Sequence, residues 1–515
     1  MPPMAPASSI LRRLMLGVGS SGMSQVISAA QPILLVPLFL RAWGTATYGR
    51  WLVLTALVSY LSMLDLGGQN YIGNLLAIDY GQGKKEAFRE KLSEGVSLFT
   101  FIAIAALIFL IIVLFGLMNS RVPIFGNAFS YEERWVILFL ASAFLLSIPG
   151  GVYVTAYRAS GLFVRGTMVG NVLRTAHFAF LAGFLYFSAS PFVYAFVFLM
   201  GGVIGTIVIV WDSRREIVVC RQIRIGFAEA KRGRKHLRGA IHFWLLALAN
   251  GLNQQGVLLV LAIFASPAIV ALYATHRTAA GLVGYVGNVL QAPMWPELSF
   301  LWAQDRREEL RKVVLTAIKI IVLISGLAAL TMWVFVPFIY PLWTGKQLQL
   351  HPLLFAVFLL QGFLAAGWFT SGWSLLAANQ HRMPARWSFA NAFVTIALSV
   401  WLAPRYGVIG VALATLLGDV LCGFLVYPKL AGGTLGLNVF RIYKDMILMV
   451  LLLTPLLAVV IVGGHFLRGW TFIAVFVMAV VIWCIPTLPL ALERKVWQQL
   501  LSSQLLKRPI ESSGR

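Results

Sequence analysis

The chain has 515 residues and a formal net charge of +23, and 59% of its residues are hydrophobic whereas only 11% are charged. A soluble globular domain carries about 25% charged residues, and the mean hydropathy of this chain, +0.84, is far above that of such a domain. The composition therefore excludes a soluble enzyme or a soluble nucleic-acid-binding domain and favours a polytopic membrane protein.

Apolar segments separated by short polar connections follow one another along the whole chain. Most are roughly 20 to 28 residues long and the shortest, 387–403, has 17, which is enough to cross a ~30 Å hydrocarbon core as a helix. A β-barrel would instead show alternating strands of roughly ten residues. We therefore predict an all-α polytopic membrane protein with about fourteen transmembrane helices. The predicted spans are residues 14–40, 51–77, 95–118, 135–157, 167–188, 190–211, 240–264, 268–293, 314–341, 352–378, 387–403, 406–428, 445–467 and 470–491.

An internal repeat indicates how these spans are organised. Two stretches about 222 residues apart match, each following the second apolar segment of its half, and duplicated bundles of this kind are typical of transporters. Because each half has an even number of spans, the repeat is parallel, with a pseudo-two-fold axis along the membrane normal. The matching residues are Gln82, Lys84, Lys85, Glu86 and Arg89 in the first stretch and Gln304, Arg306, Arg307, Glu308 and Arg311 in the second.

The longest polar connection divides six spans from six. We predict a six-helix N-lobe over residues 1–212, a basic cytoplasmic connection over 213–239 and a six-helix C-lobe over 240–428. Residues 429–515 hold two extra C-terminal helices, spans thirteen and fourteen, and a cytoplasmic tail.

The distribution of basic residues predicts the orientation of the chain. With a cytoplasmic N-terminus, about 31 of the 41 Lys and Arg lie in cytoplasmic connections and termini, which is the positive-inside bias. Both termini are therefore predicted to be cytoplasmic. The connection 213–239 holds the largest basic block, which we interpret as an orientation signal resting on anionic lipid. A docking site for a cytoplasmic partner is the alternative.

Polar residues recur on one helical face in the first two spans of each half. Ionisable or polar side chains inside a span are costly, so they indicate function by default. Four helices with such polar faces, two in each lobe, are what a water-filled cavity between the lobes would need. The alternative role for these polar residues is hydrogen bonding between helices. The predicted cavity-lining residues in these spans are Ser28 and Gln31 in the first, Asn250, Asn253 and Gln254 in the seventh, and Asn288 and Gln291 in the eighth.

Basic residues inside spans are candidates for binding an anionic headgroup. Arg277, with His276 beside it, lies about two turns inside the eighth span, and a guanidinium binds phosphate in a bidentate way. Snorkelling to the outer headgroups is the alternative for Arg277. Arg174 shares a face of the fifth span with Asn171 and His177, where it extends a basic lining or neutralises a buried acid.

Two acidic residues inside spans are candidates for ion coupling or gating. Asp65 lies near the middle of the second span, and Asp419 lies in the twelfth. A salt bridge to a basic neighbour such as Arg277 is the alternative for Asp65.

Motifs for enzyme chemistry are missing from the sequence. We find no phosphate-binding glycine loop, no metal-spaced histidine cluster and no plausible acyl-transfer triad. Cys220, Cys422 and Cys484 lie far apart, with neither a disulfide framework nor metal-ligand spacing. We therefore expect no catalytic residue, no metal and no cofactor, and we predict that the protein is not an enzyme.

Three motifs near the N-terminus carry a family resemblance. They are Pro37-Leu38-Phe39-Leu40, Tyr48-Gly49-Arg50-Trp51 and Asp65-Leu66-Gly67. In this order and spacing, and within a fourteen-span plan, they resemble the bacterial polysaccharide and O-antigen flippases. Those proteins belong to the multidrug, oligosaccharidyl-lipid and polysaccharide exporter superfamily.

The resemblance implies a function and a location. It implies a flippase that moves an undecaprenyl-pyrophosphate-linked oligosaccharide from the cytoplasmic to the periplasmic leaflet of the bacterial inner membrane. Alternating access between the lobes, coupled to an ion, would drive this step of cell-surface polysaccharide biosynthesis, for O-antigen or exopolysaccharide. Expected partners are the lipid-linked oligosaccharide, membrane lipids and a polysaccharide polymerase or glycosyltransferase. No nucleic acid is expected as a partner, and the protein is expected to be a monomer.

Two relatives in the same superfamily are alternatives. Drug antiporters commonly have an acidic residue in the first span, and residues 14–40 contain neither Asp nor Glu. Lipid II flippases have several arginines in the leading helices, and residues 14–40 and 51–77 contain none. A third class, a non-transporting scaffold whose basic connection recruits envelope enzymes, also remains open.

Overall fold

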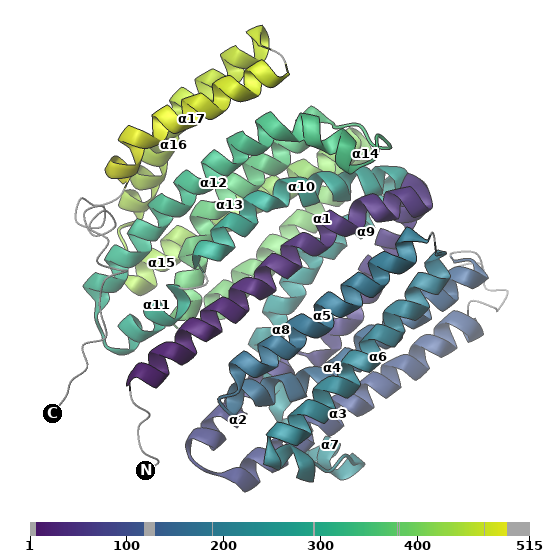
Figure 1. Ribbon diagram of the computed structural model, residues 1–515. Helices are drawn as coiled ribbons and strands as arrows, with labels where there is room; N and C mark the ends of the chain where they lie inside the picture. The colour runs from purple at the N-terminus through teal and green to yellow at the C-terminus, as the bar shows by residue number, and fades with distance from the viewer. Residues whose placement is uncertain are drawn as a thin grey trace. The chain divides into compact units, whose positions relative to one another are not determined.

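A computed structural model describes residues 7–117, 129–187, 189–291, 294–378, 380, 382–467 and 469–491. Nearly all of these residues are helical, and the described part of the chain has no β-strand (Figure 1). The α-helices are, in order, α1 (Ala7–Ser59), α2 (Gly68–Gly81), α3 (Lys85–Ile111), α4 (Tyr131–Ala159), α5 (Phe163–Tyr186), α6 (Pro191–Glu216), α7 (Phe227–Gly233), α8 (Leu237–Gly251), α9 (Val257–Phe264), α10 (Pro267–Gln291), α11 (Met294–Ala303), α12 (Arg307–Trp343), α13 (Pro352–Ala377), α14 (Arg382–Gly418), α15 (Tyr427–Leu435), α16 (Val439–Phe466) and α17 (Trp470–Ala491).

Short helical turns of other types interrupt several of the long helices. Three are 3₁₀-helical and three are π-helical. They are η1 (Tyr60–Asp65), η3 (Val218–Gln222) and η4 (Arg234–His236) of the first type, and η2 (Ile112–Leu117), η5 (Leu252–Gly256) and η6 (Asp419–Phe424) of the second.

Ten stretches of the described residues are helical, long and apolar enough to cross a membrane. Two of them, Gly22–Gly81 with 60 residues and Arg382–Leu435 with 54, are far longer than the ~20 residues that one crossing needs. Each contains a glycine with non-helical backbone angles, Gly44 (φ 70°, ψ 179°) and Gly407 (φ 57°, ψ −136°). These glycines divide each stretch into two helical segments, and Trp470–Ile485 of α17 is a shorter apolar helix. The predicted all-α polytopic fold is confirmed.

The described helices form two compact units. Unit 1 consists of Met1–Ala279, Pro341–Leu354 and His381–Cys422, and unit 2 of Ala280–Tyr340, Phe355–Gln380 and Gly423–Arg515. Unit 1 thus takes segments from both sides of the basic connection. The division into an N-lobe and a C-lobe stays a prediction from the repeat.

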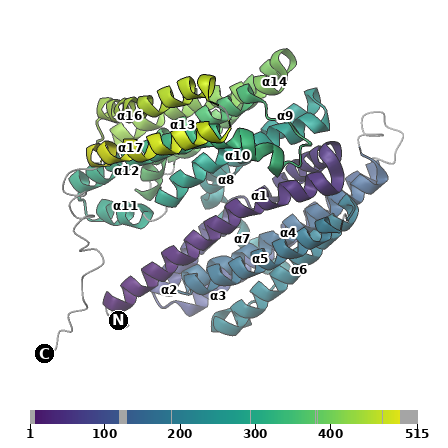
Figure 2. The ribbon, with the colours of Figure 1, turned by 45° about the horizontal axis from the view of Figure 1, so that its top comes forward.

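In unit 1, α4 packs against α1, α2, α3 and α6, so it occupies the middle of a bundle (Figures 1 and 2). Its start is fixed by a capping box in which Ser130 Oγ accepts from the Glu133 amide and the Glu133 carboxylate accepts from the Ser130 amide. Aliphatic and aromatic side chains from α2, α3 and α4 fill the interior, among them Leu76, Phe99 and Val152. Farther along the chain, α8 and α9 pack against α14.

The kink at Gly44 gathers aromatic rings from α1 and α6. Phe39 and Tyr48 stack with ring centroids 5.1 Å apart, and Trp51 meets Tyr194 edge-on at 5.1 Å. Arg50 binds Glu133 at the start of α4 with two nitrogen–oxygen distances of 2.5 and 3.2 Å. The motif residues around Tyr48 and Arg50 therefore hold α1 against its neighbours in unit 1.

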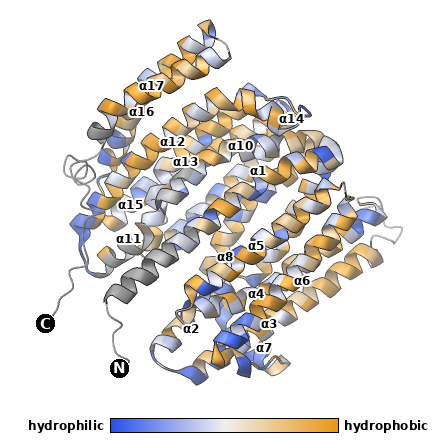
Figure 3. Ribbon diagram, viewed as in Figure 1, coloured by the Kyte–Doolittle hydropathy of each residue, from blue (hydrophilic) through white to orange (hydrophobic). Residues whose placement is uncertain are grey.

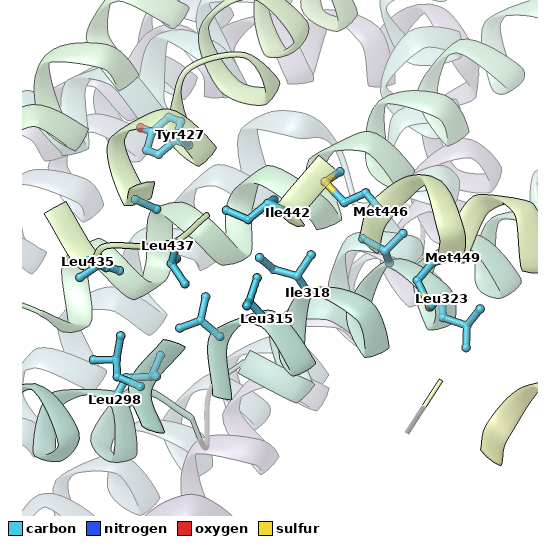
Figure 4. Close-up of a cluster of buried hydrophobic side chains, with 14 of the residues drawn as sticks. Leu298, Leu315, Ile318, Leu323, Tyr427, Leu435, Leu437, Ile442, Met446 and Met449 are labelled. Carbon is cyan, nitrogen blue, oxygen red and sulfur yellow. The ribbon is translucent and has the colours of Figure 1, made fainter. Parts of the chain in front are cut away.

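Unit 2 has its own apolar interior, where α11, α12, α15 and α16 meet (Figure 4). Leu315, Ile318 and Leu323 of α12 line it together with Ile442 and Met446 of α16. One ion pair also joins these two helices, because Lys319 Nζ lies 3.5 Å from the carboxylate of the buried Asp445. α17 packs along α16 (Figure 2).

Candidate functional site

The second predicted span is broken at Asp65. The 3₁₀ turn η1 ends there, and Leu66 (φ 49°) and Gly67 (φ 71°) both adopt left-handed backbone angles before α2 begins. Asp65 Oδ1 accepts a hydrogen bond from the Gly67 amide at 3.0 Å. Within the described residues no Lys, Arg or His forms an ion pair with Asp65, so the alternative salt bridge to Arg277 is absent there.

Gly67 lies at a very close contact between this break and α8. A Cβ atom there would lie 2.5 Å from the amide nitrogen of Trp244 and 2.7 Å from the carbonyl oxygen of Ala240. The indole nitrogen of Trp244 also donates to the carbonyl of Met63 at 3.1 Å. Only glycine combines this backbone angle with this approach, which gives the Asp65-Leu66-Gly67 motif a structural reason.

The seventh predicted span contains a π-helical turn, η5, which holds the predicted residues Asn253 and Gln254. Such turns are rare and are frequently found at functional sites. Two backbone carbonyls at this turn accept hydrogen bonds from side chains of other helices: Tyr60 Oη donates to Gly251 at 3.4 Å, and Arg277 Nη1 donates to Gln254 at 2.8 Å. The sequence predicted the polar residues but gave no signal for the π-helix.

Arg277 lies above a buried tyrosine on its own helix. Its guanidinium carbon is 5.7 Å from the centre of the Tyr273 ring, and Tyr273 is fully buried. The charges of Arg277 and Asp419 both act on the Tyr273 phenol, and the Thr415 hydroxyl lies beside it. Arg277 and Asp419, predicted separately as a cation for the substrate and an acid for coupling, are therefore neighbours of the same phenol.

Asp419 begins a second π-helical turn, η6. Asn391 Nδ2 of α14 donates to its carboxylate at 3.0 Å, and Thr395 Oγ1 donates to the Asn391 side-chain oxygen at 3.2 Å. Asn391 and Thr395 are both buried. The sequence analysis did not select these two residues for the site. Within the described residues, no group of three or more His, Cys, Asp or Glu is placed to hold a metal ion.

His276 is fully buried and bound to backbone on both sides of its ring. Its Nδ1 lies 2.8 Å from the Leu272 carbonyl, and the His351 amide donates to its Nε2 at 2.8 Å. The first contact requires a proton on Nδ1 and the second requires none on Nε2, which defines a neutral tautomer. This geometry favours a structural role that fastens the connection before α13.

Arg174 contacts two serines on one face of α1, Ser24 and Ser28. Its Nη1 donates to Ser28 Oγ at 2.9 Å and lies 3.4 Å from Ser24 Oγ, while Asn171 Nδ2 donates to the Ser20 carbonyl at 3.1 Å. Asn171 and Arg174 of the fifth predicted span thus contact the polar face of the first. Arg174 itself remains exposed and binds no acid in the described part of the chain.

His177 lies on the side of α5 that faces α6. Its ring centroid is 5.2 Å from that of Phe198, and a Cβ at Gly201 would clash with the imidazole. The buried Nε2 atom has no hydrogen-bond partner within the described residues. The structure therefore separates His177 from the contact that Arg174 makes with α1.

The remaining predicted residues are dispersed. Gln31, Asn250 and Asn253 belong to unit 1 and are at least partly exposed. Asn288 and Gln291 belong to unit 2, where the buried Gln291 donates through Nε2 to Thr370 Oγ1 at 3.3 Å. The structure thus brings Arg277 to Gln254 and to Tyr273, whose phenol also interacts with Asp419, and it separately brings Arg174 to Ser28.

A second contact in unit 1, which the sequence analysis missed, ties α1 to the last residue of α12 and to the connection that follows. Pro37 has no amide hydrogen, so the Ile33 carbonyl four residues earlier loses its helical donor. The indole nitrogen of Trp343 donates to this carbonyl at 2.6 Å, and Gln347 Nε2 donates to the Leu40 carbonyl at 2.8 Å. The prolines of α1 were the available signal, since each one exposes a carbonyl.

Comparison with solved structures identifies the class of fold. The chain aligns with the lipid II flippase MurJ in its inward closed conformation at a TM-score of 0.66 and 13% identity, over 96% of this chain and 100% of that one. It aligns with an inward-facing multidrug resistance transporter of the MATE family, in the MOP superfamily, at a TM-score of 0.58 and 17% identity, over 79% of this chain and 95% of that one.

A third solved structure agrees. The MATE multidrug transporter DinF-BH aligns at a TM-score of 0.57 and 14% identity, over 85% of this chain and 98% of that one. No family model and no curated protein matches the sequence. The chain is a multi-pass membrane protein with the fold of the flippases and transporters of this superfamily.

Proposed function

We propose that this protein is a flippase for an undecaprenyl-pyrophosphate-linked oligosaccharide, working by ion-coupled alternating access in the bacterial inner membrane. It would carry its substrate from the cytoplasmic to the periplasmic leaflet for cell-surface polysaccharide biosynthesis. Moving a pyrophosphate and a sugar chain through hydrocarbon unaided would cost tens of kcal/mol. A polar path that contains fixed cations removes most of this cost.

The observation that carries the proposal is the extent of the match to a lipid-linked-substrate flippase. The alignment with MurJ covers 96% of this chain, whereas those with the two MATE transporters above cover 79% and 85%. The first predicted span also has no acidic residue. Both observations favour a lipid-linked substrate over a small drug.

Arg277 is the residue proposed to bind the pyrophosphate. A guanidinium pairs with phosphate oxygens in a bidentate way, and Arg277 is positioned by the Gln254 carbonyl and the Tyr273 ring. Arg174 supplies a second cation. Asp419, bound to Asn391, and Asp65, at the break in the second span, are the proposed coupling or gating acids.

The lipid II flippase remains the second candidate, because the alignment with MurJ covers 96% of this chain and all of MurJ. Against it stands the absence of arginine from residues 14–40 and 51–77. Binding of a polymerase or glycosyltransferase, both termini in the cytoplasm and a monomeric state belong to the proposal as well.

A reconstituted flipping assay tests the proposal. Liposomes containing the protein would receive either an undecaprenyl-pyrophosphate oligosaccharide or lipid II, under imposed proton or sodium gradients. We expect faster flipping of the oligosaccharide and an effect of one gradient. Faster flipping of lipid II would select the second candidate, and drug efflux from cells without flipping would select an antiporter.

A further inference from the structure

The basic connection between α6 and α8 is a folded element of unit 1 that is docked on α3. Ser93 and Ser97 lie one helical turn apart on α3. Ser93 Oγ accepts from the Arg224 amide at 3.2 Å, and Ser97 Oγ accepts from the Gly226 amide at 3.2 Å. The chain then enters α7, which packs along α3.

A buried acid fixes the other half of the connection. The Glu94 side chain is only 5% exposed and faces three basic residues. Its carboxylate lies 2.8 Å from His236 Nε2, 3.1 Å from Lys235 Nζ and 3.6 Å from Arg232 Nε. Gly233 packs so closely that a Cβ would lie 2.7 Å from the Glu94 carbonyl oxygen. One acid thus holds the end of α7 and the turn η4 in place.

The segment before α7 is also folded back on the bundle. Arg221 donates through Nε and Nη2 to the carbonyls of Arg214 and Arg215, both at 2.8 Å, near the end of α6. The neighbouring Cys220 is completely buried, and burial raises the pKa of its thiol to about 12. The connection is therefore folded against α3 and the end of α6.

Large apolar side chains are exposed on the surface of this connection and the end of α6. Trp211, Val218 and Phe227 are 59%, 65% and 65% exposed. Phe227 makes an edge-on contact with Phe101 of α3, with centroids 5.9 Å apart. Phe101 is itself partly exposed and is followed on α3 by the exposed Ile104 and Ile108. Because α3 is a membrane span by length and hydropathy, Phe227 lies level with its apolar part.

Exposed cations occur in the same connection as Val218 and Phe227. Hydrophilic residues gather around α7 and the adjoining end of α3 (Figure 3). Four of the basic side chains, Arg224, Lys231, Arg234 and Arg238, are exposed and outside the contacts with Glu94. Aromatic and aliphatic groups in the hydrocarbon boundary with basic groups beside them are what an interfacial element presents to an anionic membrane.

We propose that residues 218–238, docked on α3 by Ser93, Glu94 and Ser97, form a platform that binds anionic phospholipid headgroups. Phe227 enters the hydrocarbon boundary beside Phe101, and the four exposed cations bind phosphate groups around it. This binding is independent of the proposed flippase substrate. The platform enriches anionic phospholipids over uncharged ones next to the protein.

Quenching by labelled lipid tests the proposal. The full chain, with Cys484→Ser and a fluorophore on Ala228→Cys, is placed in phosphatidylcholine nanodiscs that contain nitroxide-labelled phosphatidylglycerol or nitroxide-labelled phosphatidylcholine. We expect phosphatidylglycerol to be preferred about tenfold, since each basic residue near the surface adds to the attraction. The quadruple variant Arg224→Gln, Lys231→Gln, Arg234→Gln and Arg238→Gln should lose this preference.

A matched control variant removes four positive charges outside residues 218–238. Lys84, Lys85, Lys312 and Lys429 are exposed and lie outside the predicted spans on the same predicted side, and their change to Gln should leave the preference unchanged. Equal quenching by the two lipids in the parent protein would overturn the proposal, as would an equal loss in both quadruple variants. A thermal unfolding midpoint measured for each variant establishes that the fold is kept, because the contacts of Glu94 are untouched.

Discussion

Arg277 and Arg174 are both arginines inside predicted spans, but their surroundings differ. Arg277 donates to a backbone carbonyl at a π-helical turn and lies over the buried Tyr273, whose phenol also interacts with Asp419. Arg174 is exposed and donates to the hydroxyl of Ser28. Backbone at a helix irregularity is a rigid partner, whereas a serine hydroxyl rotates freely. The comparison suggests a positioned cation at Arg277 and an adaptable one at Arg174.

The largest expected effect is that of Arg277→Ala. A hydrogen bond to a charged group contributes roughly 1.5 to 3 kcal/mol, so we expect flipping to slow by about 10- to 150-fold. The flipping rate in liposomes measures this, with the amount of inserted protein as the control. Arg277→Lys keeps the charge but loses the bidentate fork, so it should recover only part of the rate. An unchanged rate in Arg277→Ala would remove this residue from the site.

Asp419→Asn separates coupling from substrate binding. The amide keeps the size of the side chain but removes its charge beside Tyr273, so we expect flipping to lose most of its response to an imposed ion gradient. Flipping without a gradient should change by less than about tenfold, because Arg277 is still held by Gln254. The matched control is Asp305→Asn, whose side chain is 82% exposed in a connection. An unaltered gradient response would exclude Asp419 from coupling.

Arg174→Ala should have a smaller effect than Arg277→Ala. An exposed cation without a rigid partner contributes less to binding, and we expect a decrease of about tenfold or less in the flipping rate. The Michaelis constant for the lipid-linked substrate should rise, with little change in the maximal rate. A larger loss than in Arg277→Ala would reverse the assignment of the two arginines.

Ser28→Ala tests the hydroxyl partner and should have the smallest effect. A single hydrogen bond contributes about 0.5 to 1.5 kcal/mol, so a change within about tenfold is expected. In the double variant with Arg174→Ala the two effects should be non-additive, because both changes remove the same contact. Simple additivity would mean that the contact between Arg174 and Ser28 does not contribute to transport.

Much of the fold follows from the order of residues along the chain. Span length and hydropathy are properties of consecutive residues, so the helices at α3, α4 and α16 could be predicted directly. The polar stripe that includes Ser28 follows from helical periodicity, but its contact with Arg174 of α5 was not predicted. His276 and Asp65 could not be understood in this way, because their partners, the backbone of His351 and of Gly67, depend on the path of the chain.

The sequence by itself determined an all-α polytopic membrane protein, the places of its spans and the polar faces within them, because each depends on neighbours within a few helical turns. Only the tertiary structure decided that Trp343 binds the carbonyl that Pro37 exposes, that Gly67 meets α8, and that Glu94 fixes the basic connection on α3. Each of these contacts joins residues far apart in the chain, so it requires the packing of helices whose register no local pattern specifies.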